Sequence, residues 1–412
     1  MSREATHIAG WTRTRLGHAF DIELGKMLSP EASVGRDLMP YLANRNVQWN
    51  QLDLDDLGYM NFARAERERF RLRSGDLLIC EGGEIGRTAI WNDELPECYF
   101  QKAIHRLRPR TATIESRLLL HYMRYAVDHN LFPGLIGQTS IAHLTREKLI
   151  QFELGHPVSI REQRRITEIL DALDDQIAES TCLIAKELSL REGVLRQLSN
   201  LYFHATTMST LAQVSLLITS GSRGWAGYYA DHGALFVRIG NLTREHINLR
   251  LDDCVFVQVP KTSEGSRAAL TPGDILISIT ADLGIIGMVP EDLGEAYINQ
   301  HVALIRVWPE VNPRWVAHML ASELGQRQFQ LANDSGAKAG LNLPAVGRVQ
   351  VPIPRRDAQD RLTGMLDESD GNIRRHRGEI AKWLLLKEGL MEDLLTGRVR
   401  VGGGGLDDVR SG

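Results

Sequence analysis

The sequence predicts an α+β protein made by duplication, in which two α/β domains alternate with two long helices that pair with each other. Three observations predict this fold class. A 37-residue segment recurs 196 residues further along the chain without a gap, and each copy carries apolar residues at heptad spacing. A glycine–aspartate pair followed by an apolar run precedes each copy. The 412 residues are enough for two or three domains.

The repeated segments predict the two long helices. Residues 162–198 and 358–394 are identical at 15 of 37 positions, and neither contains proline. Apolar residues at steps of 3, 4 or 7 indicate a heptad seam on a helix of about 35 residues, roughly 50 Å long. Such a helix cannot bury a narrow stripe alone, so we expect each to pack on its copy; helices that reach into another protein are the alternative. The predicted seam residues are Ile166, Leu170, Ile177, Ile184, Leu188 and Leu195 in the first helix, and Leu362, Leu366, Ile373, Ile380, Leu384 and Met391 in the second.

The segments between the helices predict two similar globular domains. Gly75-Asp76 and Gly273-Asp274 each precede four or five apolar residues, which indicates a turn that leads into a buried strand. Residues 117–129 and 314–329 have the pattern of amphipathic helices. We therefore predict a first domain over 1–160, a first long helix over 161–203, a second domain over 204–355, a second long helix over 356–401 and a flexible tail over 402–412.

Composition and motifs exclude several classes of function. Lys plus Arg is 48 and Asp plus Glu is 52, so the net charge of −4 gives no basic footprint over the whole chain. No run is apolar enough for a membrane helix, and four scattered cysteines favour a reducing cytoplasm over a disulfide framework. The sequence contains no phosphate-binding GxxxxGK[ST] loop, no HExxH zinc pair and no D/E-x-K nuclease element. We therefore predict a protein that is not itself an enzyme and holds no metal.

A globular segment followed by a long helix, with both present twice in the same order, resembles the specificity subunit of Type I restriction-modification systems. The residues that carry the resemblance are the two Gly-Asp pairs, Gln101 and Gln300 near a later strand, and the closing segment 390–401. It implies two α/β target-recognition domains on long helices that pack antiparallel as a coiled-coil spacer, and a double-stranded DNA target of two half-sites with a fixed gap. It also implies that this chain binds no cofactor: S-adenosylmethionine belongs to two methyltransferase subunits, and ATP and magnesium to partner restriction and translocase subunits.

The candidate DNA-reading residues are donor side chains in predicted loops, because base edges are read by Arg, Lys, Asn, Gln, Ser and Thr. They are Arg45, Asn46, Arg87, Lys102, Gln138, Thr139 and Ser140 in the first domain, and Ser222, Arg223, Asn241, Lys338 and Asn342 in the second. We expect Gln101 and Gln300 to be buried strand residues bonded to backbone, and the mixed-charge run 63–73 to be a solvated surface.

Two other readings of the sequence stay open. The same architecture would serve a methylation-only complex without a nuclease partner. A duplicated coiled-coil scaffold that binds only protein is the second alternative, and it predicts no sequence-dependent DNA binding.

Overall fold

The chain folds into two compact units that each combine one globular domain with parts of both long helices. The computed structural model describes residues 8–35, 37–132, 143–205, 208–221, 224–258, 267–333 and 340–401. Unit 1 comprises residues 1–179 and 380–412, and unit 2 comprises residues 180–379. The division therefore runs through the middle of each long helix, and each unit is described by itself.

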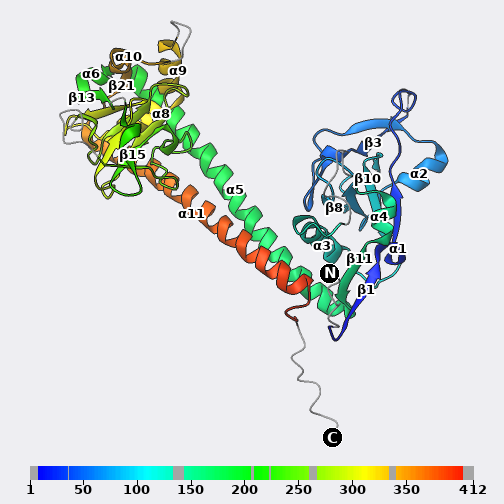
Figure 1. Cartoon of the computed structure of the whole chain (residues 1–412). Coiled ribbons are helices and arrows are strands. Elements are labelled where there is room, and N and C mark those ends of the chain that lie inside the picture. Colours follow the sequence, from blue (N-terminus) through cyan, green and yellow to red (C-terminus); the bar gives the residue numbers. More distant parts are fainter. Residues whose placement is uncertain are drawn as a thin grey trace. The chain divides into compact units, whose positions relative to one another are not determined.

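The long helices are α5, Ile160–Ala205, and α11, Arg356–Leu395 (Figure 1). Both begin within a residue of their predicted starts. The predicted end of the second at residue 401 is wrong, because Gly397 has a positive φ of 75° and the Val399 amide bonds to the Asp393 carbonyl at 3.0 Å. Such a left-handed glycine terminates a helix. The predicted tail, 402–412, lies outside the described residues.

The two helices run antiparallel in each unit. In unit 1, Arg400 donates to Glu162 and Lys387 donates to Asp174. The partner's residue number therefore falls as the residue number rises along α5, which is the pattern of antiparallel segments. In unit 2, α5 likewise meets α11 through the ion pair of Arg191 with Asp370. This confirms the predicted antiparallel helix pair.

The heptad seam is buried or half-buried at ten of its twelve predicted positions and is exposed at one repeated position. Leu188 is 37% exposed and its equivalent Leu384 is 52% exposed. One helical turn beyond each leucine, a cation of the same helix, Arg191 or Lys387, pairs with an aspartate of the other helix. Ion pairs thus replace leucine packing here, and the prediction of these two as seam residues is wrong. The buried seam residues are Ile166, Leu170, Leu195, Leu366, Ile373 and Met391, and the half-buried ones are Ile177, Ile184, Leu362 and Ile380.

The two globular domains share one sheet topology, which confirms the duplication. In unit 1 a four-stranded antiparallel sheet has the order β2-β10-β7-β8, and in unit 2 the order is β13-β20-β17-β18. These strands are Phe20–Leu24, Ile104–Pro109, Leu77–Cys80 and Thr88–Ile90 in unit 1, and Ser215–Ser220, Val302–Val307, Ile275–Ser278 and Ile286–Met288 in unit 2.

Smaller sheets and short helices complete each domain. Unit 1 adds a sheet β6-β3-β9 and the pairs β1-β11 and β4-β5, and unit 2 adds a sheet β14-β16-β15-β19 and the pair β12-β21. The bounds in unit 1 are β1 Trp11–Arg15, α1 Leu16–Ala19, β3 Leu38–Leu42, η1 Asn44–Asn46, β4 Val47–Gln48, β5 Gln51–Leu52, β6 Gly58–Asn61, α2 Arg64–Phe70, β9 Tyr99–Phe100, α3 Ser116–Asp128, α4 Arg146–Gln151 and β11 Glu153–Pro157. Those in unit 2 are β12 Met208–Thr210, α6 Leu211–Val214, η2 Trp225–Tyr228, β14 Tyr229–Ala230, β15 Ala234–Val237, η3 Ile239–Asn241, β16 Phe256–Val257, β19 Ala296–Ile298, α8 Pro313–Ala321, α9 Glu323–Ala332, α10 Leu343–Arg348 and β21 Gln350–Pro352.

The helix after each sheet follows the prediction in unit 1 but not in unit 2. The segment 117–129 forms α3 as expected. The segment 314–329 is two helices, because Ser322 takes an extended backbone conformation and its hydroxyl accepts from the Gly325 amide, so it caps α9.

Each four-stranded sheet is covered by a hydrophobic core on both faces. In unit 1, Leu107 packs with Met123 of α3 on one face, and Ile104 packs with Tyr99 on the other. Unit 2 repeats this arrangement with two further clusters. Among the described helices, none combines the length and the apolar character needed to cross a membrane.

Candidate nucleic-acid interface

The aspartate of each Gly-Asp pair is a structural anchor. Asp76 is 1% exposed and accepts two bonds of 2.7 Å from Arg108 on β10. Asp274 is 0% exposed and accepts two bonds of 2.7 Å from Arg306 on β20. Such bidentate pairs are strong and directional. The pair therefore fixes the turn before β7 or β17 on the neighbouring strand rather than facing a ligand.

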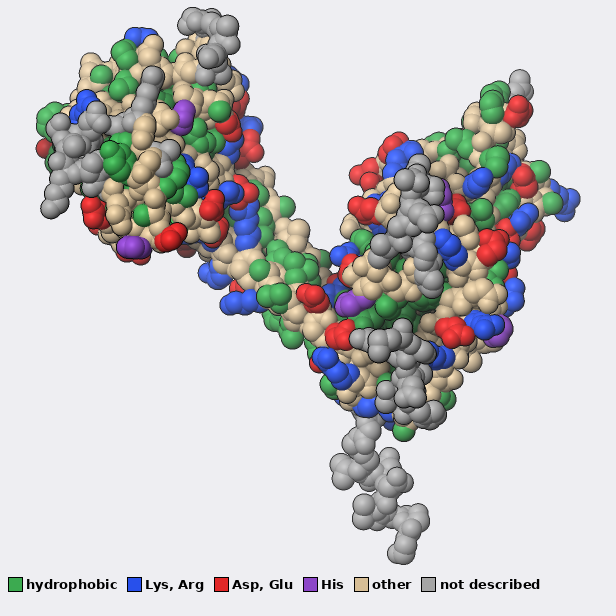
Figure 2. Space-filling view, in the orientation of Figure 1, with side chains coloured by type: hydrophobic (Ala, Val, Ile, Leu, Met, Phe, Trp, Pro, Cys, Tyr) green, Lys and Arg blue, Asp and Glu red, His purple; other side chains and the backbone are tan. Residues whose placement is uncertain are grey.

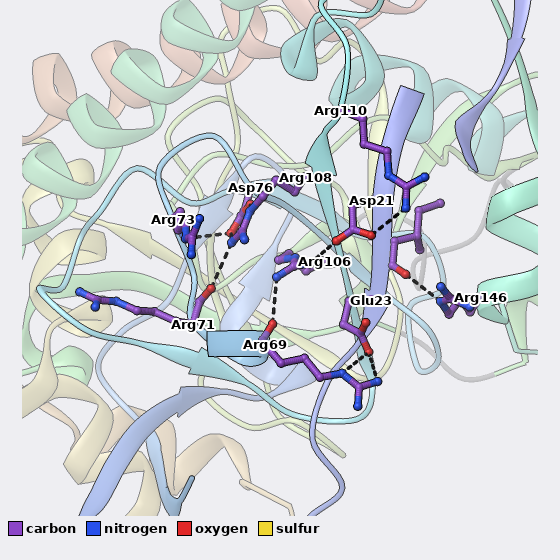
Figure 3. A network of polar contacts seen from close by, with 11 residues as sticks. Asp21, Glu23, Arg69, Arg71, Arg73, Asp76, Arg106, Arg108, Arg110 and Arg146 are labelled. Atoms are coloured by element: carbon purple, nitrogen blue, oxygen red, sulfur yellow. Dashed lines mark hydrogen bonds and ion pairs between the residues drawn. The ribbon is translucent and has the colours of Figure 1, made fainter. Parts of the chain in front are cut away.

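Around Asp76 the first domain carries a network in which arginines outnumber carboxylates (Figure 3). Arg106 is 3% exposed and donates to Asp21 at 2.7 Å and to the Arg69 carbonyl at 3.0 Å. Arg69 itself is 61% exposed beside Glu23. The charged side chains of the run 63–73 are thus largely exposed, whereas Phe70 and Leu72 are buried, and Arg106 and Arg108 of β10 donate to the carbonyls of Arg69 and Arg71.

The second domain lacks most of this network. Four and two positions before Gly273 the second domain has Ala269 and Thr271, where the first domain has Arg71 and Arg73. The arginines at these two positions are therefore specific to unit 1.

Loops from distant parts of the sequence meet at one end of the first sheet, and we call this set loop cluster 1 (residues 25–26, 43–46, 81–87, 101–102 and 143–144). The side-chain amide of Asn44 donates to the Gly82 carbonyl at 2.7 Å, and the backbone amide of Leu144 donates to the Glu81 carbonyl at 2.8 Å. Any Cβ at Gly25 would overlap the Gln101 carbonyl. Bonds to backbone carbonyls therefore hold the loops together.

Loop cluster 2 is the equivalent set in unit 2 (residues 221, 238–241, 279–282, 299–301 and 340–341). The Ile279 amide donates to the His301 carbonyl at 3.0 Å, and the Leu341 amide donates to the Ile279 carbonyl at 2.9 Å. Gly221 takes the place of Gly25, because a Cβ there would overlap the Ile298 carbonyl. Both domains therefore present an equivalent loop surface.

Comparison with known proteins identifies this architecture. Residues 9–188 match the model of the Type I restriction modification DNA specificity domain. Residues 9–188 therefore form a domain of the type I restriction specificity family. It is 22% identical, over 396 residues and 90% of both chains, to a putative type I restriction enzyme MjaX specificity subunit of Methanocaldococcus jannaschii.

Solved structures show the same fold over nearly the whole chain. The S subunit of a type I system from M. genitalium matches with a TM-score of 0.62 and 14% identity, covering 95% of this chain and 98% of that one. A chain from a study of type I R-M complex assembly matches with a TM-score of 0.57 and 16% identity, covering 96% and 100%. The likeness therefore extends to the second domain and the second helix.

Two of the predicted DNA-reading residues are wrong. Asn46 and Asn241 are 1% and 2% exposed, and each side-chain oxygen accepts from the backbone amide three residues earlier, that of Ala43 or Arg238. Each amide group donates to two carbonyls further along the chain. A side chain with all its bonds inside the domain cannot reach a base edge.

The other described candidates divide by exposure. Arg45 is 54% exposed, although it pairs with Asp56 at 2.9 Å, and Lys102 is exposed at the turn before β10. Arg87 is only 12% exposed and donates to the Asn44 carbonyl at 2.6 Å, so it braces loop cluster 1. Asn342 is exposed but caps α10 by accepting from the Ala345 amide at 2.8 Å. Gln138, Thr139, Ser140, Ser222, Arg223 and Lys338 lie outside the described residues.

The two equivalent glutamines occupy a place that the sequence did not predict. Gln101 and Gln300 are half-buried and precede β10 and β20 rather than lying within them. The Gln300 amide nitrogen lies 2.9 Å from His301 Nε2, and His301 Nδ1 lies 2.9 Å from the Thr280 hydroxyl. The expectation of buried strand residues is therefore wrong. Sequence reasoning missed this polar group, for which the adjacent Gln-His pair was the only signal.

Proposed function

We propose that this specificity subunit reads a bipartite DNA target, with each domain binding one half-site, and directs adenine methylation and restriction by partner subunits. The observation that carries the proposal is the duplication. Both domains share the sheet order and the buried aspartate–arginine pair but differ in their loops, as expected of one scaffold that carries two recognition surfaces.

The long helices support a fixed gap between the half-sites. With 46 and 40 residues, α5 and α11 are about 69 and 60 Å long at 1.5 Å per residue. Successive turns of duplex DNA are about 34–36 Å apart. An antiparallel pair of this length can therefore serve as a spacer between two readers placed one turn or more apart.

Equivalent surfaces in the two units support two copies of one partner, which we take to be methyltransferase subunits. A cavity of about 520 Å³ in unit 1 is lined by Lys387, Glu388 and Met391, and one of about 420 Å³ in unit 2 by their equivalents, Arg191, Glu192 and Leu195. Hydrophobic side chains are exposed along the helices (Figure 2), among them Leu188, Leu190, Leu384 and Leu386.

The chemistry would then belong to the partners. Adenine methylation uses S-adenosylmethionine on the methyltransferase subunits and requires the base to be flipped out of the duplex. Cleavage and translocation, with ATP and magnesium, would belong to restriction subunits in the cytoplasm. In this scheme the present chain supplies affinity and sequence choice without a catalytic group of its own.

Domain exchange tests the proposal. Residues 1–160 are replaced by the recognition domain of another specificity subunit, and the methylome of cells that also express the methyltransferase partner is sequenced. We expect one half-site to change and the other half-site to persist. If both half-sites change together, or neither does, the assignment of one domain to one half-site is wrong. If the assembled complex binds a randomised duplex library without sequence preference, the scaffold function is correct instead.

A further inference from the structure

Each unit contains the same polar network at the place where its globular domain meets the helix pair. In unit 1, Arg117 of α3 donates two bonds of 2.6 Å to Asp171 of α5, and His121 lies 2.8 Å from the same carboxylate. In unit 2, Arg314 donates two bonds of 2.6 Å to Asp367, and His318 lies 3.0 Å away. We call these networks joint 1 and joint 2.

Each joint continues onto the opposite long helix. One turn beyond Asp171, Asp174 pairs with Lys387 of α11. One turn beyond Asp367, Asp370 pairs with Arg191 of α5 at 2.5 Å. The domain, its own helix and the opposite helix are therefore connected in series by charged groups, in both units.

The helix that carries the arginine and histidine also packs on the sheet. In α3, residues 117 and 121 are four apart and share one face, while Leu119 and Met123 lie in the core below the sheet. In α8, Val316 and Met319 pack in the corresponding core. This helix is thus the rigid link between the recognition sheet and the spacer.

Both joints are partly buried, and their carboxylates stay charged, so each arginine is held in one orientation. His121 and His318 are 1% and 0% exposed. Burial raises the pKa of Asp171, but bonds from His121 and Arg117 outweigh it and lower that pKa to about 2. The same opposing causes lower the pKa of Asp367 to about 2. Both carboxylates are therefore charged acceptors that hold the arginine fork in one orientation.

The same residues have the composition of a metal site, but their charges are already balanced. One histidine and two aspartates converge in each joint, within 4.8 Å of one another. Each of the two carboxylates, however, already faces a cationic side chain, Arg117 and Lys387 in joint 1. A divalent ion would leave two uncompensated positive charges in a largely buried place, which is costly. The networks are therefore ion-paired connections.

We propose that joints 1 and 2 set the angle at which each recognition domain stands on the helix pair, and that they thereby fix the gap between the half-sites. The inference rests on the proposed bipartite target. One base pair corresponds to about 3.4 Å and about 35° of rotation along DNA. A domain that is free to shift by a few ångströms and to rotate by a few tens of degrees would accept targets whose gap is one base pair longer or shorter.

Arginine-to-lysine substitutions test the joints because they keep the charge and remove the two-pronged geometry. Arg117→Lys and Arg314→Lys are compared with two surface pairs outside the joints and the cavities: Arg15→Lys, which pairs with Glu153 in unit 1, and Arg355→Lys, which pairs with Asp357 in unit 2. In the methylome of the assembled complex, we expect the ratio of off-gap to on-gap methylation to rise at least tenfold in the joint variants and to stay unchanged in the controls. The half-site sequences should not change.

An angle measurement keeps the inference testable apart from DNA recognition. Spin labels at Tyr59→Cys of the domain and Asp175→Cys of α5, with Cys182 and Cys254 replaced by serine, report the domain–helix distance within unit 1. We expect Arg117→Lys to widen the distance distribution at least twofold. The inference would be overturned if Arg117→Lys left both the spin-label distance distribution and the range of methylated gap lengths as narrow as in the parent protein. A widened distribution in a complex that methylates no bipartite target would instead refute the proposed function while supporting the role of the joint.

Discussion

Replacement of the buried aspartate of the second domain gives a sharp test of why the Gly-Asp pair is present. In Asp274→Asn, the side chain keeps its shape but loses its charge and one acceptor. The carboxylate is 0% exposed and accepts three bonds, two of 2.7 Å from Arg306 and one of 2.8 Å from the Thr271 amide. The side-chain NH2 group of asparagine cannot accept a hydrogen bond. It would face either the Arg306 guanidinium or the Thr271 backbone amide, so at least one of these donors loses its acceptor.

The size of the effect follows from the exposure of the partner. Loss of one member of a buried ion pair costs about 3–5 kcal/mol, and the lower end of about 3 applies because Arg306 is 33% exposed and can be partly hydrated. For a unit of this size, each kcal/mol lowers Tm by about 2–4 °C. We therefore expect Asp274→Asn to lower the Tm of unit 2 by about 6–12 °C.

Calorimetry on the full chain, with hydrogen exchange to assign the transition to unit 2, measures the effect. Asp282→Asn is the matched control, because Asp282 is 59% exposed and its pair with Arg244 is on the surface, worth less than about 1 kcal/mol. Adding Arg306→Met to Asp274→Asn should recover part of the loss, since it removes the stranded charge. The reasoning is refuted if Asp274→Asn shifts the Tm no more than Asp282→Asn does.

Three further predictions concern the spacer, the loops and acid stability. Insertion of one heptad after Glu179 and one after Glu379 should lengthen the DNA gap by about three base pairs without changing the half-sites, as read in a methylome, because seven residues add about 10 Å. Asn241→Ala should lower the free energy of unfolding, measured in urea, by about 1–3 kcal/mol. Lys102→Ala should leave the free energy of unfolding unchanged and reduce the slope of log K for DNA binding against log salt concentration by about one. Because the pKa of Asp367 is lowered to about 2, its contribution to stability is present above about pH 4 and is lost as the pH falls toward 2, so Asp367→Asn should flatten the acid limb of a stability–pH curve.

The architecture was predictable because the sequence contains it twice. Gln163 and Gln359 are one of the identical pairs that reveal the duplication, and they are 0% and 1% exposed. Each side-chain oxygen accepts from a backbone amide at the start of the helix after the sheet, that of Glu115 or Asn312, at 2.9 and 2.8 Å. Each also donates to the backbone before its own long helix. Identity between the copies therefore indicated a shared internal contact.

The details that sequence could not give depend on tertiary neighbours. Leu188 and Leu384 fit the heptad pattern, but the two helices form ion pairs beside them. Sequence periodicity does not indicate whether leucine packing or an ion pair forms at such a position. Asn46 and Asn241 carry the groups that read bases, yet each caps a short 3-10 turn. A donor side chain in a loop has the same sequence appearance whether it binds backbone or DNA.

The duplication also separates residues that hold the fold from residues that could distinguish the two half-sites. A side chain that performs the same internal task in both copies must stay the same, as Asn46 and Asn241 do, whereas a reader of different bases must differ. In loop cluster 1, Arg45 directly precedes Asn46, and the equivalent residue before Asn241 is Gly240. Lys102 follows Gln101, and His301 follows Gln300. Positions that are exposed, lie in the loop clusters and differ between the copies are therefore the places where a change of residue should alter one half-site and leave the other intact.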